Sequence, residues 1–358
     1  MLGAISLMIL SYHSLAGSGK APAKQFFPKS ASADGGPVRE YALRKESEVM
    51  RPAIDQQGRI WFGAMGQNAL VVFDTRTRTF KYLTPPRGRH GIMGVQVAPD
   101  DTIWFAEQYA NYIGHYFPGA GRYQIYSLPW ITIPDPGHAI QKLSLPSAPN
   151  ELALDAHGDV WFTEFNADSL GRLDPRTGRM QHYFLSPKPS VQTLYPYGVT
   201  VDRQGNVWFT ESGNNQVGRL EPTTGAIHVF AVPDPDALTM EIASDEQGFL
   251  WVTSFTPGLL FRYEPHTGTF TTYTVSLRGN ERGTLYGLLV TTSGDVWVTI
   301  LAANMLAHLD VRTGRFLFYR IPAPGSLPLG LAMDANQNLW FTGLDKIGML
   351  HPARPISQ

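Results

Sequence analysis

The 358-residue sequence contains no cysteine, which excludes disulfides, thiolate metal sites and a cysteine nucleophile. Charged residues make up only 16% of the chain and nearly cancel, leaving a formal net charge of −1. Without an excess of positive charge, the chain lacks the electrostatic field that nucleic-acid binding requires. It also lacks an apolar run of about 20 residues, the length that a membrane-spanning helix needs.

Tryptophan, by contrast, recurs in nearly the same local sequence at spacings of 43 to 57 residues. The seven residues are Trp61, Trp104, Trp161, Trp208, Trp251, Trp297 and Trp340. In the units of Trp161, Trp208 and Trp251, the tryptophan lies between an Asp-x-x-Gly turn and a Pro-x-Thr-Gly turn, and the unit reads as four short strands. Such a period is typical of β-propeller blades. The sequence therefore predicts an all-β fold, a seven-bladed β-propeller with four-stranded blades.

The two ends of the repeat predict how the ring closes. The last unit stops at His351-Pro352 without an outer strand, whereas residues 38–43 read as an outer strand with no unit before them. We expect this N-terminal strand to pair with the C-terminal blade, because an uncovered sheet edge promotes aggregation. The predicted organisation is a leader over residues 1–35, one propeller over 36–352 and a tail over 353–358.

The leader contains a short apolar stretch, Leu2 to Leu10, followed by small residues and Ala21-Pro22-Ala23. This order resembles a secretory signal, so we expect a secreted or periplasmic protein. The alternative is a disordered leader on a cytoplasmic protein. We expect a monomer, with a small molecule as its partner.

Carboxylates recur at one end of the predicted second strand in three successive units. Glu107, Glu164 and Glu211 each follow their tryptophan by three residues. In a four-stranded meander this position lies on the face that carries the connections between blades, here called the top face. Three acids on adjacent blades could hold Mg²⁺ or Ca²⁺. Alternatively, they could pair with arginines such as Arg172 or Arg219.

A second set of residues rings the predicted central channel. Eleven residues before each tryptophan stands the residue that enters the inner strand, and we call these seven residues the collar. They are Met50, Met93, Asn150, Tyr197, Met240, Tyr286 and Leu329. We expect this mostly apolar and aromatic collar to bind a flat or hydrophobic small molecule. The next position is glycine in four units and charged in three, so Arg51, Glu151 and Glu241 are predicted to recognise polar groups of the ligand.

Only two of the histidines that lie between predicted strands fall in connections on the top face. They are His90 and His138, which flank the second unit. Together with Glu107 they could supply a general base and a carboxylate that orients the base or binds a metal ion. They are therefore the candidate catalytic residues.

The repeat Gly-Val-x-Val-Asp-x-x-Gly-x-Val-Trp-Phe-Thr-Glu-x-x-x-Asn-x-Val-Gly-Arg-Leu resembles the virginiamycin B lyase (streptogramin lyase) family over residues 36–352. The resemblance implies a seven-bladed propeller and a carbon–oxygen lyase that linearises cyclic depsipeptide lactones, using Mg²⁺ and a histidine base. That family places its essential histidines directly before Gly-Ile or Ala-Ile at the start of inner strands. In this sequence the collar occupies those positions, as Tyr197 does in Pro-Tyr-Gly-Val.

Three functions remain open at this point. The first is a lyase-like enzyme that acts on an ester or lactone, with His90 or His138 as the base and a cation near Glu107, Glu164 or Glu211. The second is a non-catalytic, exported propeller that binds a small molecule or protein partner through the collar, in the central channel or on the top face. The third, less favoured, is a lactone hydrolase with a deeply bound metal.

Overall fold

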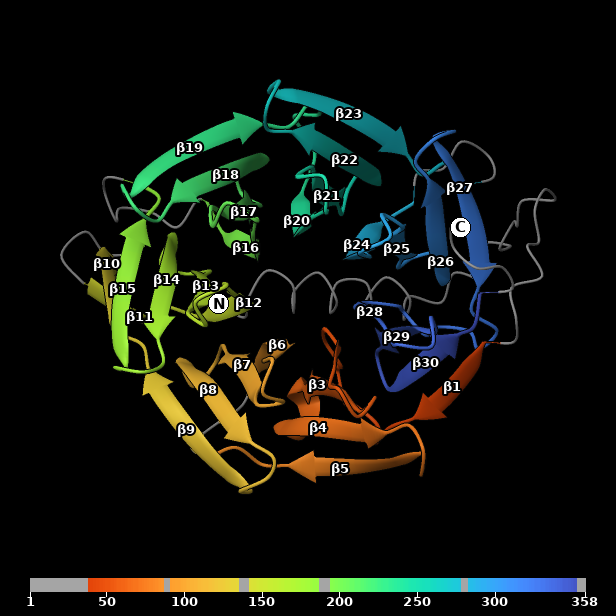
Figure 1. Cartoon of the computed structure of the whole chain (residues 1–358), viewed down its shortest axis with the longest axis horizontal. Helices are drawn as coiled ribbons and strands as arrows, with labels where there is room; N and C mark the ends of the chain where they lie inside the picture. The colour runs from red at the N-terminus through yellow and green to blue at the C-terminus, as the bar shows by residue number, and fades with distance from the viewer. Residues whose placement is uncertain (1–37, 87–90, 135–141, 187–193, 278–282, 353–358) are drawn as a thin grey trace.

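The computed structural model describes residues 38–86, 91–134, 142–186, 194–277 and 283–352. Within these ranges, seven four-stranded antiparallel sheets stand around a central axis as the blades of a propeller (Figure 1). The predicted fold is therefore confirmed. None of the helices in these ranges has the length and apolar character needed to cross a membrane. The expected leader and tail lie outside the described residues.

In each of the first six blades the chain runs from the axis outward. The first blade comprises β2 (Ala53–Ile54), β3 (Ile60–Ala64), β4 (Ala69–Asp74) and β5 (Thr79–Leu83), with the 3-10 helix η1 (Met65–Gln67) between β3 and β4. The second comprises β6 (Ile92–Val97), β7 (Ile103–Glu107), β8 (Tyr112–Phe117) and β9 (Arg122–Ser127). The third comprises β12 (Pro149–Leu154), β13 (Val160–Glu164), β14 (Ser169–Asp174) and β15 (Arg179–Phe184).

The remaining blades repeat this order. The fourth comprises β16 (Pro196–Val201), β17 (Val207–Glu211), β18 (Gln216–Glu221) and β19 (Ala226–Ala231). The fifth comprises β20 (Thr239–Ser244), β21 (Leu250–Ser254), β22 (Leu259–Glu264) and β23 (Thr269–Thr274). The sixth comprises β24 (Leu285–Val290), β25 (Val296–Ile300), β26 (Met305–Asp310) and β27 (Arg315–Arg320).

The seventh blade is built from both ends of the propeller. Its inner strands are β28 (Leu331–Met333), β29 (Leu339–Gly343) and β30 (Lys346–Leu350), and its outer strand is β1 (Arg39–Ala42). Strand β1 pairs antiparallel with β30, with Tyr41 opposite Ile347. The Tyr41 ring also contacts Phe73 of the first blade, at a centroid separation of 4.8 Å. The predicted closure by an N-terminal strand is confirmed.

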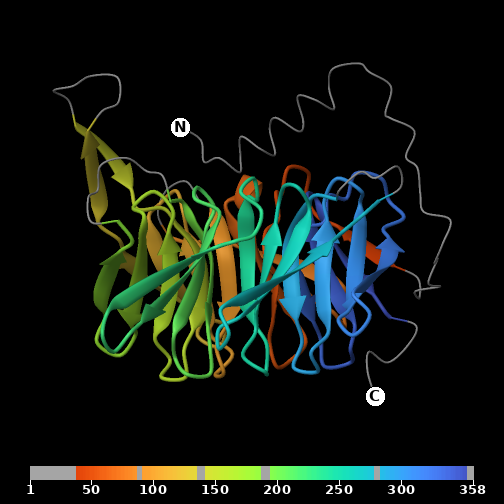
Figure 2. The same cartoon turned by 90° about the horizontal axis from the view of Figure 1, so that it is seen from above.

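A two-stranded hairpin occupies the connection between the second and third blades. It consists of β10 (Trp130–Pro134) and β11 (Lys142–Pro146). The hairpin projects from the ring at the top face (Figure 2). It is the insertion that lengthens the spacing between the second and third tryptophans.

The Asp-x-x-Gly turn supports the tryptophan of its own blade. In the fourth blade, Asp202 Oδ1 accepts hydrogen bonds from the backbone N–H groups of Gln204 and Asn206, each at 2.9 Å. Its Oδ2 accepts a 2.7 Å hydrogen bond from Trp208 Nε1. The same indole bond recurs at Asp55, Asp155, Asp245 and Asp334. One carboxylate thus shapes the turn and satisfies a polar atom that burial would otherwise leave unpaired.

Neighbouring blades pack through the aromatic rings of the second strand. Trp208 of the fourth blade shares a buried cluster with Val252 and Phe261 of the fifth. Phe209 lies over Gly218, where an added Cβ would come within 2.0 Å of the ring. Any side chain there would collide with the ring, which explains the glycine of the recurring Val-Gly-Arg segment.

Candidate functional site: the central channel

The inner strands bulge where they approach the channel. In five blades, two residues of the inner strand face a single residue of the second strand. The two residues are the collar residue and the one after it, as with Tyr197 and Gly198 in the fourth blade. A bulge redirects side chains and frees backbone groups from the ladder. The positions predicted to form the site are therefore the irregular ones.

In four of these five blades, a threonine opposite the bulge restores the lost backbone hydrogen bonds. Thr210 Oγ1 accepts a 2.9 Å hydrogen bond from Gly198 N–H and donates one of 2.6 Å to the carbonyl of Met240 in the next blade. The same pair of bonds recurs at Thr163, Thr253 and Thr299. This threonine therefore fixes the bulge and joins adjacent blades. Sequence reasoning missed its role, although its fixed place two residues after the tryptophan was the available signal.

The collar fills the upper end of the channel. All seven collar residues are buried, and six of them pack with Ala148, Phe165 and Leu301 in one apolar cluster. The seventh, Asn150, donates from Nδ2 to the carbonyl of Tyr197 at 3.1 Å. The hydroxyls of Tyr197 and Tyr286 hydrogen-bond to each other across the ring. The predicted residues thus converge, but in the described structure their side chains contact one another.

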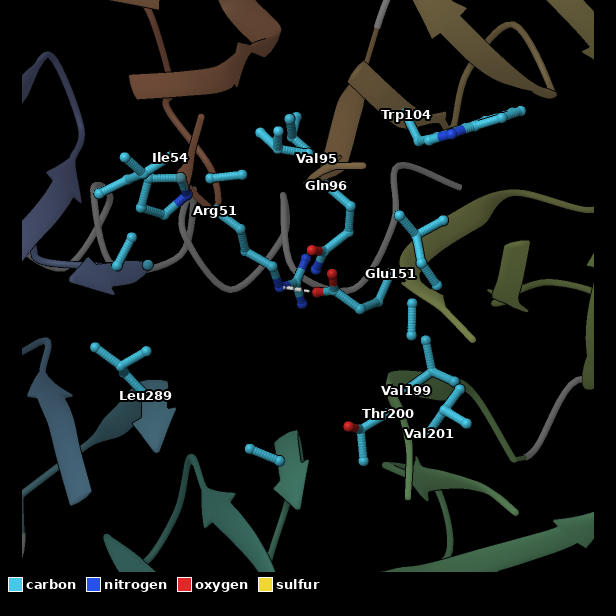
Figure 3. A pocket seen from close by; sticks show the side chains of 18 of the residues that line it. Arg51, Ile54, Val95, Gln96, Trp104, Glu151, Val199, Thr200, Val201 and Leu289 are labelled. Carbon is cyan, nitrogen blue, oxygen red and sulfur yellow. Dashed lines mark ion pairs between the residues drawn. The ribbon is translucent and has the colours of Figure 1, made fainter. Parts of the chain in front are cut away.

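A charged cluster lies directly below the collar. Arg51, Glu151 and Glu241 come from the first, third and fifth blades and meet in the channel. Figure 3 shows the pair of Arg51 and Glu151. Arg51 Nη2 lies 2.6 Å from Glu241 Oε1, and Arg51 Nε lies 2.9 and 3.1 Å from the two Glu241 oxygens. Arg51 Nε also pairs with Glu151. The guanidinium lies 4.9 Å from the centre of the Tyr197 ring, a cation–π distance.

Glycine at the equivalent position of other blades lets the neighbouring inner strand approach closely beside this cluster. At Gly94, an added Cβ would lie 3.3 Å from Glu151 Oε1 and 2.9 Å from the Asn150 carbonyl. At Gly287, it would come within 1.9 Å of the Leu329 carbonyl. The position after the collar residue, predicted to be charged in three blades and glycine in four, thus forms one layer of the channel. The three charged side chains occupy the interior of that layer.

Burial and mutual attraction set the charges of the cluster. Burial lowers the pKa of Arg51, but the nearby Glu151 and Glu241 raise it further, so the net pKa lies well above its ordinary value. Burial raises the pKa of Glu151 to about 8, although Arg51 opposes the shift. Burial therefore favours the protonated form of Glu151. Arg51 and Glu241 then form the ion pair, and the cluster as a whole is uncharged.

Below the cluster, a cavity of about 1030 Å³ extends toward the face that carries the Asp-x-x-Gly turns, here called the bottom face. Arg51, Glu151 and Glu241 line its inner end, and the exposed Ala156 and His157 lie at its rim. Its walls are the inner strands, which supply small or apolar side chains and two polar ones, Gln96 and Thr200. The channel is therefore open at the bottom face and closed by the collar above.

The three predicted metal-binding glutamates are each buried at the top end of their strands. Glu107 accepts a hydrogen bond from Gly91 N–H. Glu164 accepts one from Ser169 Oγ at 2.7 Å and pairs with His182 Nδ1 at 2.8 Å. Burial, followed by the charge of Asp168, raises the pKa of Glu211 to about 7.

Within the described ranges, no three His, Cys, Asp or Glu side chains come together in a group suited to a metal ion. Glu107 and Glu164 already have the protein partners described above. The described residues do not fit a ready-made Mg²⁺ site, and the expected cation stays a prediction.

The alternative pairing of these glutamates with arginine is wrong for the two arginines considered. Arg172 Nη2 lies 2.6 Å from Asp159, and Arg219 Nη2 lies 2.5 Å from Glu221. Arg172 is paired across the sheet with Trp161, three residues along the strand from Glu164. That separation is about 10 Å. The carboxylate and the guanidinium are therefore at different heights in the blade.

The two candidate catalytic histidines, His90 and His138, lie outside the described residues. The strand after His90 is described, and it follows the same register as the other blades. Ile92 lies opposite Glu107, as Pro196 lies opposite Glu211. Met93 is therefore the collar residue of the second blade.

Comparison with known proteins agrees with this architecture. The model of the virginiamycin B lyase family matches residues 133–350. No curated protein sequence matches. A solved streptogramin B lyase superposes with a TM-score of 0.77 at 24% identity, covering 88% of this chain and 97% of that one.

Two further solved structures are similar. Selenomethionine-substituted virginiamycin B lyase from Staphylococcus aureus gives a TM-score of 0.76 at 24% identity, covering 88% of this chain and 99% of that one. A catalytically inactive variant of that enzyme with quinupristin gives 0.75 at the same identity and coverage. At these identities, the structures show a shared fold.

Proposed function

The chain belongs to the virginiamycin B lyase family, and from that premise we propose that it is a small-molecule-binding propeller whose ligand occupies the central channel. The observation that carries this proposal is the cavity of about 1030 Å³ with a buried charged cluster at its inner end. Binding sites in proteins are typically concave and mostly apolar, with a few polar groups that fix the ligand. This cavity has that composition.

The collar supports binding rather than the family's reaction. The positions at which the family places histidine hold Met, Asn, Tyr and Leu, and all of them are buried. A general base must reach the proton that it removes. A buried methionine or leucine has no group that could do so.

A thermal-shift screen of lactones and cyclic peptides, with and without Mg²⁺, tests the proposal. Ala243 lines the cavity, and Ala243→Phe should place a ring inside it and reduce the shifts that the wild type shows. Ala231→Phe is the matched control, because Ala231 lies exposed at the end of the outer strand β19. Hits that Ala243→Phe leaves unchanged, or no hits with the wild type, would contradict channel binding.

A lyase-like reaction at the top face is the second candidate, and Glu211 is the observation that favours it. A carboxyl whose pKa is raised to about 7 by burial is suited to proton transfer at neutral pH. Incubation with cyclic depsipeptides and mass analysis for linear products tests this candidate. Cleavage that disappears in Glu211→Gln would support it, whereas cleavage that persists would exclude Glu211 as the base.

A further inference from the structure

The inner end of the channel contains a hydrogen-bond donor that is not used. Arg51 Nη1 is buried and has no hydrogen-bond partner among the described residues, and Arg51 itself is only 8% exposed. A buried donor without a partner costs free energy that a ligand acceptor would recover. The donor belongs to a residue that lines the cavity and extends into it (Figure 3).

Gln96 adds a second polar group close to this donor. Its side chain points toward Arg51 and Glu151 from the second blade (Figure 3). Gln96 also lines the cavity. A primary amide both donates and accepts hydrogen bonds. The inner end of the cavity therefore offers a charged donor beside a neutral donor–acceptor pair.

Apart from Thr200, the remaining wall at this level is apolar and built mostly from small residues. At the level of Gln96, five of the other six blades contribute alanine or leucine. They are Ala53, Ala153, Ala243, Leu289 and Ala332. Short side chains keep the channel wide, and their apolar surface favours an apolar ligand body.

We propose, building on channel binding, that the ligand is an uncharged molecule with an apolar body and a carbonyl oxygen that accepts a hydrogen bond from Arg51 Nη1. The charge of Arg51 is already matched by Glu241, whose two oxygens both lie within 3.1 Å of Arg51 Nε. A third charge would therefore enter a buried site without a free partner, which is costly. An amide or ester head group satisfies the donor and leaves the charge balance unchanged.

A cationic ligand would need a carboxylate that is free to pair with it. Glu241 is engaged by Arg51, and Glu151 also pairs with Arg51 Nε while burial favours its protonated form. An ammonium group would therefore have to compete with Arg51 for either carboxylate. A carboxylate ligand would instead compete with Glu241 for Arg51.

Calorimetric titration with phenylacetamide, phenylacetate and phenethylammonium at neutral pH tests the ligand class, since the three share an apolar body and differ in head-group charge. We expect phenylacetamide to bind at least about tenfold more tightly than either ion. Gln96→Leu should weaken that binding roughly threefold to tenfold. Gln181→Leu, on the exposed outer strand β15, should leave it unchanged.

The outcomes separate the ligand class from the site itself. Tighter binding of either ion that is lost in Ala243→Phe would overturn the uncharged class and leave channel binding intact. Binding of phenylacetamide that is insensitive to Ala243→Phe would place it elsewhere and overturn both. If none of the three probes binds, the inference fails, while the screen of lactones and cyclic peptides still tests channel binding independently.

Discussion

At the scale of single residues, hydrogen bonds between buried polar atoms stabilise this propeller, because a buried polar atom without a partner is costly. In five blades, the aspartate six residues before the tryptophan accepts the indole N–H of that tryptophan. The sixth blade has Thr291 in that place, and Trp297 Nε1 has no partner among the described residues. The sequence predicted a structural role for the turn. It could not show the indole bond, because that bond depends on how the turn folds back toward the strand.

The sixth blade therefore offers a stabilising substitution. Thr291→Asp should give Trp297 Nε1 an acceptor and raise the free energy of unfolding by about 1 kcal/mol. The new carboxylate would lie near Asp295, but the third blade already combines Asp155 with Asp159 in this arrangement. Urea denaturation measures the change. Thr291→Asn, which provides the oxygen without the charge, is the control, and a loss of stability in both variants would contradict the explanation.

Glu211 should give the protein a measurable pH dependence of stability. Its pKa is raised from 4.5 to about 7 in the folded state, chiefly by burial. Between these values the folded protein holds a proton that the unfolded chain has lost, so stability is greatest at low pH and falls as pH rises through this window. Glu211→Gln should reduce that fall by roughly 2 kcal/mol.

Urea midpoints on the two sides of this window, at about pH 5 and about pH 8, measure the effect. Glu264→Gln, on strand β22, is the matched control. If the wild type and Glu211→Gln lose equal stability across the window, Glu211 is not the group responsible.

At the scale of the element, the inner strand and its bulge determine the site. The fixed number of residues before each tryptophan correctly placed the collar, and the charged residues that follow it, in the channel. It could do so because each blade repeats the same spacing. The same distance could not show that the collar side chains fill the channel, since the bulge redirects them after the strand has formed. It also could not assign partners to Glu164, because Arg172 and His182 are both near in sequence and only the strand register separates them.

We expect substitution of the threonine opposite the bulge to destabilise the blade more than substitution elsewhere in it. Thr210→Val keeps the shape of the side chain but leaves Gly198 N–H and the Met240 carbonyl without their hydrogen-bond partner. We expect the free energy of unfolding to fall by about 2 to 3 kcal/mol. Thr272→Val, on the exposed outer strand β23, should change it by less than about 0.5 kcal/mol. Chemical denaturation of the two variants compares them directly. Equal losses of unfolding free energy would argue against a role of Thr210 in fixing the bulge and joining the blades.

At the scale of the whole molecule, the ring depends on one pairing between distant parts of the chain. Arg39 pairs with Met349, so β1 covers an edge of β30 that would otherwise be exposed. The repeat count and the missing outer strand were enough to predict this closure, because each blade needs four strands. The open and closed ends of the channel were not predictable, since they depend on how seven side chains pack together.

Removal of residues 1–43 should open the ring. The exposed edge of β30 would then be free to pair with another chain. We expect self-association and a loss of roughly 3 kcal/mol or more in unfolding free energy, because β1 also packs on Phe73 and Trp340. Light scattering and chemical denaturation measure the two effects. Removal of residues 1–37 alone keeps β1 and is the control, and identical behaviour of the two truncations would show that closure is dispensable.

The pairing of β1 with β30 also imposes an order of events during synthesis. The ribosome makes β1 before any blade exists, but β30, the strand that it joins, follows all the other described strands of the propeller. During translation, blades one to six can assemble as an open arc while β1 waits as an unpaired segment. Chaperones that shield exposed strands would therefore act mainly on this interval, and a ribosome stalled before β30 would carry an arc that cannot close.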